Sequence, residues 1–311
     1  MRILFTGGSS FTGYWFVREL TDAGHEVVAI LRRRRNDYEG LRRMRVEGLQ
    51  DLCEGVVAEC SFGDDRFLGL VKQGGWNLLC QHAAETANYK DPGFDAAGAL
   101  VSNTRNARAV VEALAEGACR RIALTGSVFE ADEGAGDERR AFSPYGLSKT
   151  FTYETFRFYA GEAGIHLGKF VIPNPFGPLE ESRFTSYLVT SWLKGEVPVV
   201  LTPDYVRDNI HVSLLARAYG AFVSRLSDKP GITAINPSGY RESQREFSVR
   251  VANELKPYLR LPCQVEFARQ TEFPEPRVRV NTDELDTTAL GWSEGQAWKE
   301  LADFYLSRQD S

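Results

Sequence analysis

The chain has 311 residues, a net charge of −5 and a pI near 5.6, and 43% of its residues are apolar. This composition is typical of a globular protein with one large or two smaller domains, and the acidic balance argues against a nucleic-acid partner. The sequence begins directly with a strand pattern, without a signal peptide or an apolar run that could cross a bilayer, so we expect no membrane partner.

The cysteines and histidines indicate the cellular compartment and whether a metal centre is expected. The five cysteines are an odd number without a C-x-x-C pair, and the four histidines lack metal-ligand spacing. Scattered free thiols are typical of a reducing compartment. We therefore expect a cytoplasmic protein without a metal centre.

The N-terminal residues have the pattern of a βαβ unit. Residues 1–6 form an apolar strand, Tyr14 to Ala23 have helical spacing, and Glu26 to Leu31 form a second strand. The glycine loop between the first strand and the helix suits a pyrophosphate, which would meet backbone amides at a helix N-terminus. A plain glycine turn is the alternative. The pattern predicts a dinucleotide site made of Gly7, Ser9, Ser10, Phe11, Thr12 and Gly13.

The residues after the second strand distinguish the two nicotinamide cofactors. NAD sites usually place an acid there for the ribose hydroxyl, whereas NADP sites place an arginine for the 2′-phosphate. Here the chain reads Leu31 to Arg35 as one leucine and four arginines, without an acid before Asp37. A guanidinium suits a phosphate, so we expect NADP bound by Arg32 and Arg33. NAD beside a solvated basic loop is the alternative.

Strand and helix patterns alternate up to about residue 170. Further strands are expected at 55–60, 76–81, 121–125 and 168–172, and helices at 41–52, before 74, at 96–116 and at 145–163. This alternation predicts an α/β fold with a doubly wound parallel sheet of the Rossmann type.

The later part of the chain is less regular. Residues 1–170, with a strand near 231–236, are expected to form the dinucleotide-binding domain. Prolines and short segments predict a smaller C-terminal substrate-binding domain from residues 171–230 and 237–311. Substrate is then expected between the two domains.

Tyr145 and Lys149 lie four residues apart, on one face of the expected helix. A free tyrosine has a pKa of about 10, and an ammonium beside it favours the phenolate and lowers that pKa. Ser127 follows a strand at the carboxyl edge where open α/β sheets bind ligands. The three residues predict proton transfer at a carbinol or carbonyl carbon, the partner reaction of hydride transfer with nicotinamide. A solvated helix face is the alternative for the tyrosine and lysine.

The glycine loop, Ser127 and the Tyr145-x-x-x-Lys149 pattern together resemble the extended short-chain dehydrogenases/reductases. More narrowly, the chain resembles their nucleotide-sugar epimerase, dehydratase and reductase branch. Further similarities follow in the order of that family and extend over nearly the whole chain: His82-Ala83-Ala84, Pro173 to Pro178, Arg207 to Val212 and Leu290-Gly291-Trp292.

The resemblance implies an enzyme in which Tyr145 is the acid/base, Lys149 lowers its pKa and holds the ribose, and Ser127 orients the substrate oxygen. It adds Phe62, His82, Ala83 and Ala84 to the cofactor site, although His82 fits equally well as a structural histidine. The helices near 100–116 and 145–163 resemble the pair that forms the family's homodimer. The resemblance also implies that Asn174 and Arg207 lie near the diphosphate of a nucleotide-sugar substrate. It implies a second arginine there, either Arg277 or Arg279, and we choose Arg279 as the candidate.

Three departures from the family pattern bear on this interpretation. Ser10 replaces the second glycine of the loop, and Phe176 replaces a tyrosine. Val128-Phe129 occupies the place of the Asp-Glu pair that eliminates water in the 4,6-dehydratases. Only Glu130 remains as a substitute for that pair, so a dehydratase is disfavoured.

We therefore expect an NADP-dependent enzyme that reduces a 4-keto nucleotide sugar, with Tyr145 donating the proton. A 4-epimerase with retained NAD is the main alternative. A reductase of a small ketone or aldehyde also shares this fold. A non-catalytic cofactor sensor stays open as well, although such proteins often lose the catalytic tyrosine that this chain keeps.

Overall fold

The structure is a computed structural model that describes residues 1–135 and 140–308. Within these residues, seven parallel strands form one sheet in the order β10-β6-β5-β4-β1-β2-β3. The direction of the strand order reverses between β1 and β4, the switch point at which such sheets bind ligands. This confirms the predicted doubly wound parallel sheet. Its strands are β1 (Arg2–Thr6), β2 (Glu26–Ile30), β3 (Gly55–Val57), β4 (Leu78–Gln81), β5 (Arg121–Ser127), β6 (His166–Ile172) and β10 (Gly231–Ile235).

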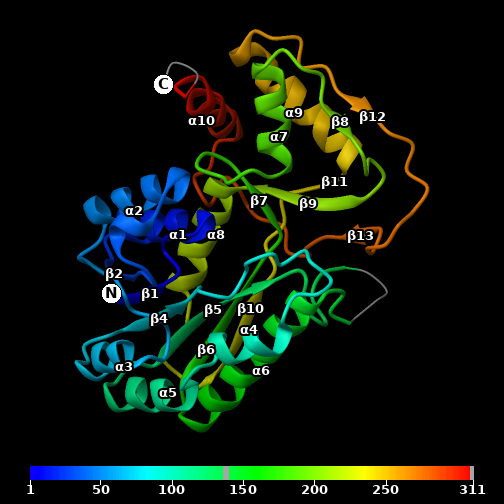
Figure 1. The fold of residues 1–311 in the computed structure, drawn as a ribbon. Coiled ribbons are helices and arrows are strands. Elements are labelled where there is room, and N and C mark those ends of the chain that lie inside the picture. Colours follow the sequence, from blue (N-terminus) through cyan, green and yellow to red (C-terminus); the bar gives the residue numbers. More distant parts are fainter. Residues whose placement is uncertain (136–139, 309–311) are drawn as a thin grey trace.

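Helices cover both faces of the large sheet (Figure 1). One face packs against α1 (Phe11–Asp22), α2 (Gly40–Leu52) and α8 (Val212–Ser224). The other packs against α3 (Asp65–Lys72), α5 (Ala107–Glu116) and α6 (Pro144–Glu162), with α4 (Ala96–Asn103) resting on α6. Alternate strand residues point to opposite faces, so the strands from β1 to β6 supply both cores. A short 3₁₀ turn, η1 (Arg35–Asp37), follows β2.

The single helix expected at 96–116 is instead two helices, α4 and α5. The backbone of Asn106 is left-handed, with a φ of 52°, which ends the helical path between them. The Asn106 side chain donates to the carbonyl oxygen of Gly63 at 2.8 Å, so a contact distant in sequence stabilises the break. The helical spacing of apolar residues continues from α4 into α5, so the sequence carries no local signal that the helix is broken there.

The C-terminal residues form a smaller layer beyond the carboxyl edge of the large sheet (Figure 1). In this layer β9 (Val206–His211) pairs with β7 (Asn174–Phe176), β11 (Tyr240–Ser243) and β13 (Val278–Arg279), and β8 (Val199–Val200) pairs with β12 (Glu266–Phe267). Three helices share its apolar core with Phe176: α7 (Phe184–Leu193), α9 (Gln244–Leu259) and α10 (Glu294–Leu306).

Helix α8 differs from the expected division of the chain. It lies within residues 171–230, which we expect to belong to the substrate-binding domain, yet it packs against α1 and β6. Its apolar face completes one core of the large sheet, and β10 then joins the edge of that sheet beside β6. In the described part of the chain, no helix is long and apolar enough to cross a membrane.

Candidate active site

A cavity of about 1380 Å³ opens where the carboxyl edge of the large sheet meets the C-terminal layer. Its lining includes the glycine loop, the ends of β4 and β5, the start of α6 and residues near 172–185 and 274–279. A pocket for one small molecule usually has about 300–1,000 Å³. This cavity therefore has room for a dinucleotide beside a second ligand.

The glycine loop packs closely against the segment after β4. Gly7 has a φ of 78°, and a Cβ atom there would lie 2.8 Å from the main-chain nitrogen of Ala83. A Cβ atom at Gly13 would lie 2.2 Å from the carbonyl oxygen of Gly7. Both positions therefore need glycine, and the loop lies at the N-terminus of α1 as a pyrophosphate site requires. Ser9, Ser10, Phe11 and Thr12 line the cavity.

Ser10 stands at the N-cap of α1, which explains why this loop accepts a side chain in place of the second glycine. Its φ of −73° is ordinary for any residue, and its Oγ accepts a hydrogen bond from the Gly13 amide at 3.1 Å. The same hydroxyl donates to the Gly7 carbonyl at 2.9 Å. This cap starts α1 at Phe11, three residues before the helix expected from apolar spacing.

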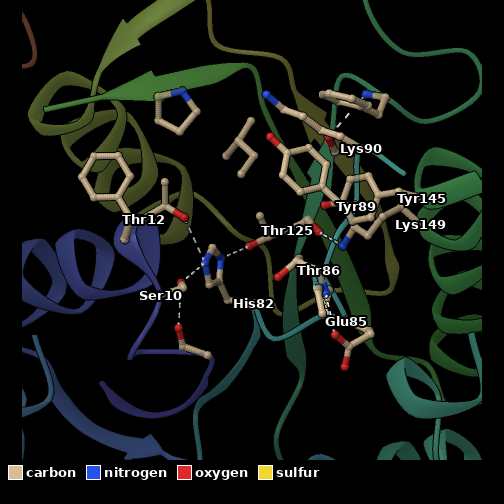
Figure 2. A pocket seen from close by; sticks show the side chains of 18 of the residues that line it. Ser10, Thr12, His82, Glu85, Thr86, Tyr89, Lys90, Thr125, Tyr145 and Lys149 are labelled. Carbon is tan, nitrogen blue, oxygen red and sulfur yellow. Dashed lines mark hydrogen bonds between the residues drawn. The ribbon is translucent and has the colours of Figure 1, made fainter. Parts of the chain in front are cut away.

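His82 connects the glycine loop to β5 (Figure 2). One ring nitrogen, Nε2, lies 3.0 Å from Ser10 Oγ and 3.1 Å from Thr12 Oγ1, and the other, Nδ1, lies 2.9 Å from Thr125 Oγ1. Burial, and then the charge of Lys149, lower the His82 pKa to about 3, so the ring is neutral. These contacts are those of a structural histidine that shapes the cofactor end of the cavity.

The four arginines after β2 divide into two pairs. Arg34 forms an ion pair with Glu59 at 2.8 Å, and Arg35 donates to the Val56 carbonyl at 2.8 Å. Arg32 and Arg33 instead line the cavity, as does Arg42, which the sequence did not single out. Arg32 also pairs with Glu85 at 3.1 Å, so an acid lies beside this basic end of the cavity.

The structure brings Ser127, Tyr145 and Lys149 together at the centre of the cavity. Ser127 is the last residue of β5, and Tyr145 is the second residue of α6, whose N-cap is Ser143. The Ser127 side chain acts on the Tyr145 phenol and lowers its pKa. Lys149 is buried one turn further along α6, and its Nζ donates to the Thr125 carbonyl at 2.6 Å (Figure 2).

The pKa of Tyr145 shifts in the direction opposite to the sequence expectation. Burial raises it, as do the nearby Glu130 and Tyr89, whereas the Ser127 hydrogen bond and Arg183 lower it. The lowering expected from Lys149 does not dominate, because the ammonium group donates to a main-chain carbonyl and burial lowers the Lys149 pKa in turn. The phenol is therefore protonated at neutral pH.

Thr125 is a site residue that sequence reasoning missed. It precedes Ser127 by two positions on β5, so both side chains face the same side of the sheet. Its hydroxyl contacts His82 Nδ1, and its carbonyl accepts the Lys149 ammonium. This alternation along the strand is a signal from which Thr125 could have been found.

Aromatic rings surround Tyr145. The ring centroid of Tyr145 lies 5.3 Å from that of Tyr89, 5.9 Å from Phe94 and 5.8 Å from Phe129. Figure 2 shows Tyr89 beside Tyr145 in the cavity. This apolar surrounding is the physical origin of the burial that raises the Tyr145 pKa.

The three arginines of the C-terminal layer that the sequence singled out, Arg207, Arg277 and Arg279, differ in their contacts. Arg207 donates through Nη1 to main-chain carbonyls such as that of Pro276, at 3.0 Å, and through Nη2 to Glu275 at 3.0 Å. Arg279 also pairs with Glu275, at 3.2 Å, but its buried Nε has no hydrogen-bond partner among the described residues. Arg279 lines the cavity, whereas Arg277 is exposed and stacks on Phe273.

Two further contacts complete this end of the cavity. The Arg279 guanidinium lies 4.0 Å from the ring centroid of Phe129 and 4.6 Å from that of Phe142. Burial, and then Arg207, lower the Arg279 pKa to about 10. Asn174 also lines the cavity and donates through Nδ2 to the Asp208 carbonyl at 3.2 Å. Arg279 is thus a buried cation that lies against both rings and lines the cavity.

Arg45 was also missed from the sequence, where it belongs to a charged stretch of an amphipathic helix. It is fully buried and donates to the Ser9 carbonyl at 2.9 Å and to the Leu179 carbonyl at 2.6 Å. It also forms an ion pair with Glu181. Arg45 therefore ties the glycine loop to the segment that follows β7.

Comparisons with known proteins agree with this geometry. Residues 3–236 match the model of the NAD dependent epimerase/dehydratase family. No curated protein sequence matches the chain. Among solved structures, the UDP-glucose 4-epimerase of Thermotoga maritima, in complex with UDP-glucose, is 18% identical and has a TM-score of 0.74, over 99% of this chain and all 100% of its own.

Two other solved structures are similar. The UDP-glucuronic acid 4-epimerase of Bacillus cereus is 15% identical over 99% of this chain and 100% of its own, with a TM-score of 0.75. The dTDP-glucose 4,6-dehydratase of Streptomyces venezuelae is 17% identical over 100% of this chain and 98% of its own, with a TM-score of 0.74. Both are complexes with NAD. The family match spans most of the chain and confirms the resemblance noted in the sequence: this protein belongs to the NAD dependent epimerase/dehydratase family.

Proposed function

We propose that this protein reduces a 4-keto nucleotide sugar with NADPH. The observation that carries the proposal is the Ser127, Tyr145 and Lys149 group, which lies between an arginine-lined cofactor end of the cavity and a second cationic end at Arg279. When bound, the nicotinamide supplies the hydride. The protein binds, orients and protonates the substrate.

The protonated state of the Tyr145 phenol supports reduction. A protonated phenol is ready to donate to the carbonyl oxygen as hydride reaches the carbon, which yields an alcohol and a tyrosinate that regains its proton from solvent. Ser127 acts on this phenol and lines the same cavity, where it orients the substrate oxygen. The positive charge of Lys149 stabilises the tyrosinate that forms.

The position of Glu130 argues against a dehydratase activity for this protein. Elimination of water needs a carboxyl group beside the substrate, and Glu130 is the candidate nearest to Ser127 in sequence. Its side chain is buried, accepts the Ser127 amide at 2.7 Å and pairs with Lys169. Glu130 is thus engaged within the protein and is absent from the described residues that line the cavity.

A 4-epimerase with retained NAD is the second candidate. It is favoured by Glu85, an acid beside Arg32, and by the epimerases among the similar structures, two of which are complexes with NAD. Mass analysis of the nucleotide released on denaturation, with NADPH oxidation over a panel of 4-keto nucleotide sugars, tests the choice. NADPH turnover supports the reductase, whereas stoichiometric NAD and no NADPH oxidation would favour the epimerase.

We predict that Arg33→Ala will lower the preference for NADPH over NADH by about 10- to 100-fold. The reason is the loss of a charge-assisted hydrogen bond to the 2′-phosphate, which contributes about 1.5–3 kcal/mol. Arg34→Ala is the matched control, because Arg34 pairs with Glu59 instead of lining the cavity. Dissociation constants for both cofactors are the measurement. If wild type and R33A preferred NADPH over NADH to the same degree, Arg33 would not bind the 2′-phosphate.

We predict that Arg279→Gln will raise KM for the nucleotide sugar by about 10- to 100-fold and leave the dissociation constant of NADPH unchanged. The guanidinium lines the cavity and lies against two rings, and loss of its contact with a diphosphate would cost about 1.5–3 kcal/mol. Arg277→Gln is the control, since Arg277 is exposed and does not line the cavity. An unchanged KM in R279Q would mean that the substrate diphosphate does not bind at the end of the cavity that Arg279 lines.

We also propose a homodimer formed through α4 and α6. Leu147, Phe151 and Phe158 are exposed on α6, where spacings of four and seven residues place them on one face. Val101 on the neighbouring α4 is also exposed. Exposed apolar stripes of this kind mark association surfaces. Light scattering is expected to give twice the chain mass of 34.8 kDa.

A further inference from the structure

A buried ionic cluster lies behind the catalytic residues. Lys169 Nζ is 2.7 Å from Glu130 Oε2 and 2.6 Å from Glu133 Oε1, and these side chains are 5%, 1% and 12% exposed. Asn236 donates to the other Glu133 oxygen at 2.6 Å. The Lys169 ammonium also lies 4.0 Å from the ring centroid of Tyr153. A lysine in the middle of a central strand is thus held by two carboxylates and a ring.

One carboxylate of this cluster reaches the catalytic serine. Glu130 Oε1 accepts the Ser127 amide at 2.7 Å, and the Glu130 amide donates to the Ser127 carbonyl at 3.0 Å. The two bonds close the turn that follows β5. A Cβ atom at Gly126 would lie 2.9 Å from Lys169 Cε and 3.2 Å from Glu130 Oε1, so the cluster fills the space beside that glycine.

The same carboxylate acts electrostatically on the catalytic pair. Glu130 raises the pKa of Tyr145, after burial, and opposes the lowering of the Lys149 pKa by burial. Lys169 has the smaller, opposite effect on Lys149. The other groups that act on Tyr145 are Tyr89, which raises its pKa, and Arg183 and Ser127, which lower it.

We propose that Glu130, held by Lys169, is a positioning residue that fixes the main chain of Ser127 and keeps a negative charge behind Tyr145 and Lys149. This inference rests on the catalytic roles proposed for Ser127 and Tyr145. Glu130 does not line the cavity, so it acts on the reaction through these residues rather than on the substrate. Glu133 belongs to the same cluster but makes no such contact with Ser127, which makes it the natural comparison.

The test is the pH profile of NADPH-dependent turnover of the panel of 4-keto nucleotide sugars in wild type, Glu130→Gln and Glu133→Gln. Reduction is lost at high pH as Tyr145 loses its proton. E130Q keeps an oxygen acceptor for the Ser127 amide but loses the charge, so the Tyr145 pKa falls and the loss of turnover at high pH begins at a lower pH than in wild type. E133Q is expected to keep the wild-type profile. Coinciding profiles for E130Q and wild type would overturn the electrostatic role.

A measurement without substrate separates this inference from the proposed function. Hydrogen exchange at the Ser127 amide is expected to be faster in Glu130→Ala than in E130Q, because only the amide side chain preserves the acceptor. E130A is also expected to lower kcat more than E130Q at equal KM. Equal exchange in the two variants would overturn the positioning role. Absence of turnover in wild type would contradict the proposed function but would leave this exchange test standing.

Discussion

Tyr145→Phe is expected to lower kcat by about 10²- to 10⁴-fold, the usual contribution of a general acid. The substitution removes only the phenolic oxygen, and the ring keeps its contacts with Tyr89, Phe94 and Phe129. Cofactor affinity is expected to stay near the wild-type value, because the glycine loop and the basic end of the cavity are untouched. Steady-state kinetics and NADPH titration are the measurements.

Tyr159→Phe is the matched control for this variant. Tyr159 lies on the same helix, α6, but does not line the cavity, so turnover is expected to stay within twofold or so of wild type. If Tyr145→Phe turned over substrate as fast as this control, Tyr145 could not be the proton donor. A loss of NADPH binding in Tyr145→Phe would instead indicate a disturbed fold.

Lys169→Met is expected to lower the free energy of unfolding by about 3–5 kcal/mol, the usual effect of removing one partner from a buried ion pair. The variant leaves Glu130 and Glu133 side by side in the interior without their cation. Methionine is close to lysine in length, so packing changes little. Urea unfolding of the wild type and the variant is the measurement.

Two comparisons make this result specific. Lys299→Met removes an exposed ion pair with Asp303 and is expected to change stability by less than about 1 kcal/mol. The triple variant E130Q/E133Q/K169M removes all charges of the cluster and is expected to recover much of the lost stability. A loss below about 1 kcal/mol in Lys169→Met would mean that the cluster is not a buried ionic unit.

Local patterns were sufficient for much of the fold. The apolar strands, the glycine loop and the helical spacing after Ser143 predicted the large parallel sheet and the neighbourhood of Tyr145, because each signal lies within one stretch of chain. Even the departure at Ser10 has a local cause, since its hydroxyl caps the helix that follows. The break between α4 and α5 escaped notice because Asn106 depends on a contact with Gly63.

Local sequence patterns could not predict the parts of the site that depend on contacts between residues distant in sequence. The sequence identified Glu130 as a candidate for water elimination, but its partner Lys169 is thirty-nine positions away, on β6. Burial of Tyr145 by rings from two segments reversed the expected direction of its pKa. Likewise, nothing local showed that Glu275 bridges Arg207 and Arg279. These features arise from packing, which spacing along the chain does not encode.

The measurement that tests the central claim most directly is isotope transfer. The enzyme is supplied with a 4-keto nucleotide sugar and with NADPH that carries deuterium at both positions of nicotinamide C4. The account predicts a product with a single deuterium at sugar C4 and an equal amount of NADP released into solution. No deuterium transfer to the 4-keto sugar, together with conversion of the parent 4-hydroxy nucleotide sugar to its C4 epimer with its own C4 hydrogen retained while NAD stays bound, would contradict the reductase and establish internal hydride return, as in an epimerase.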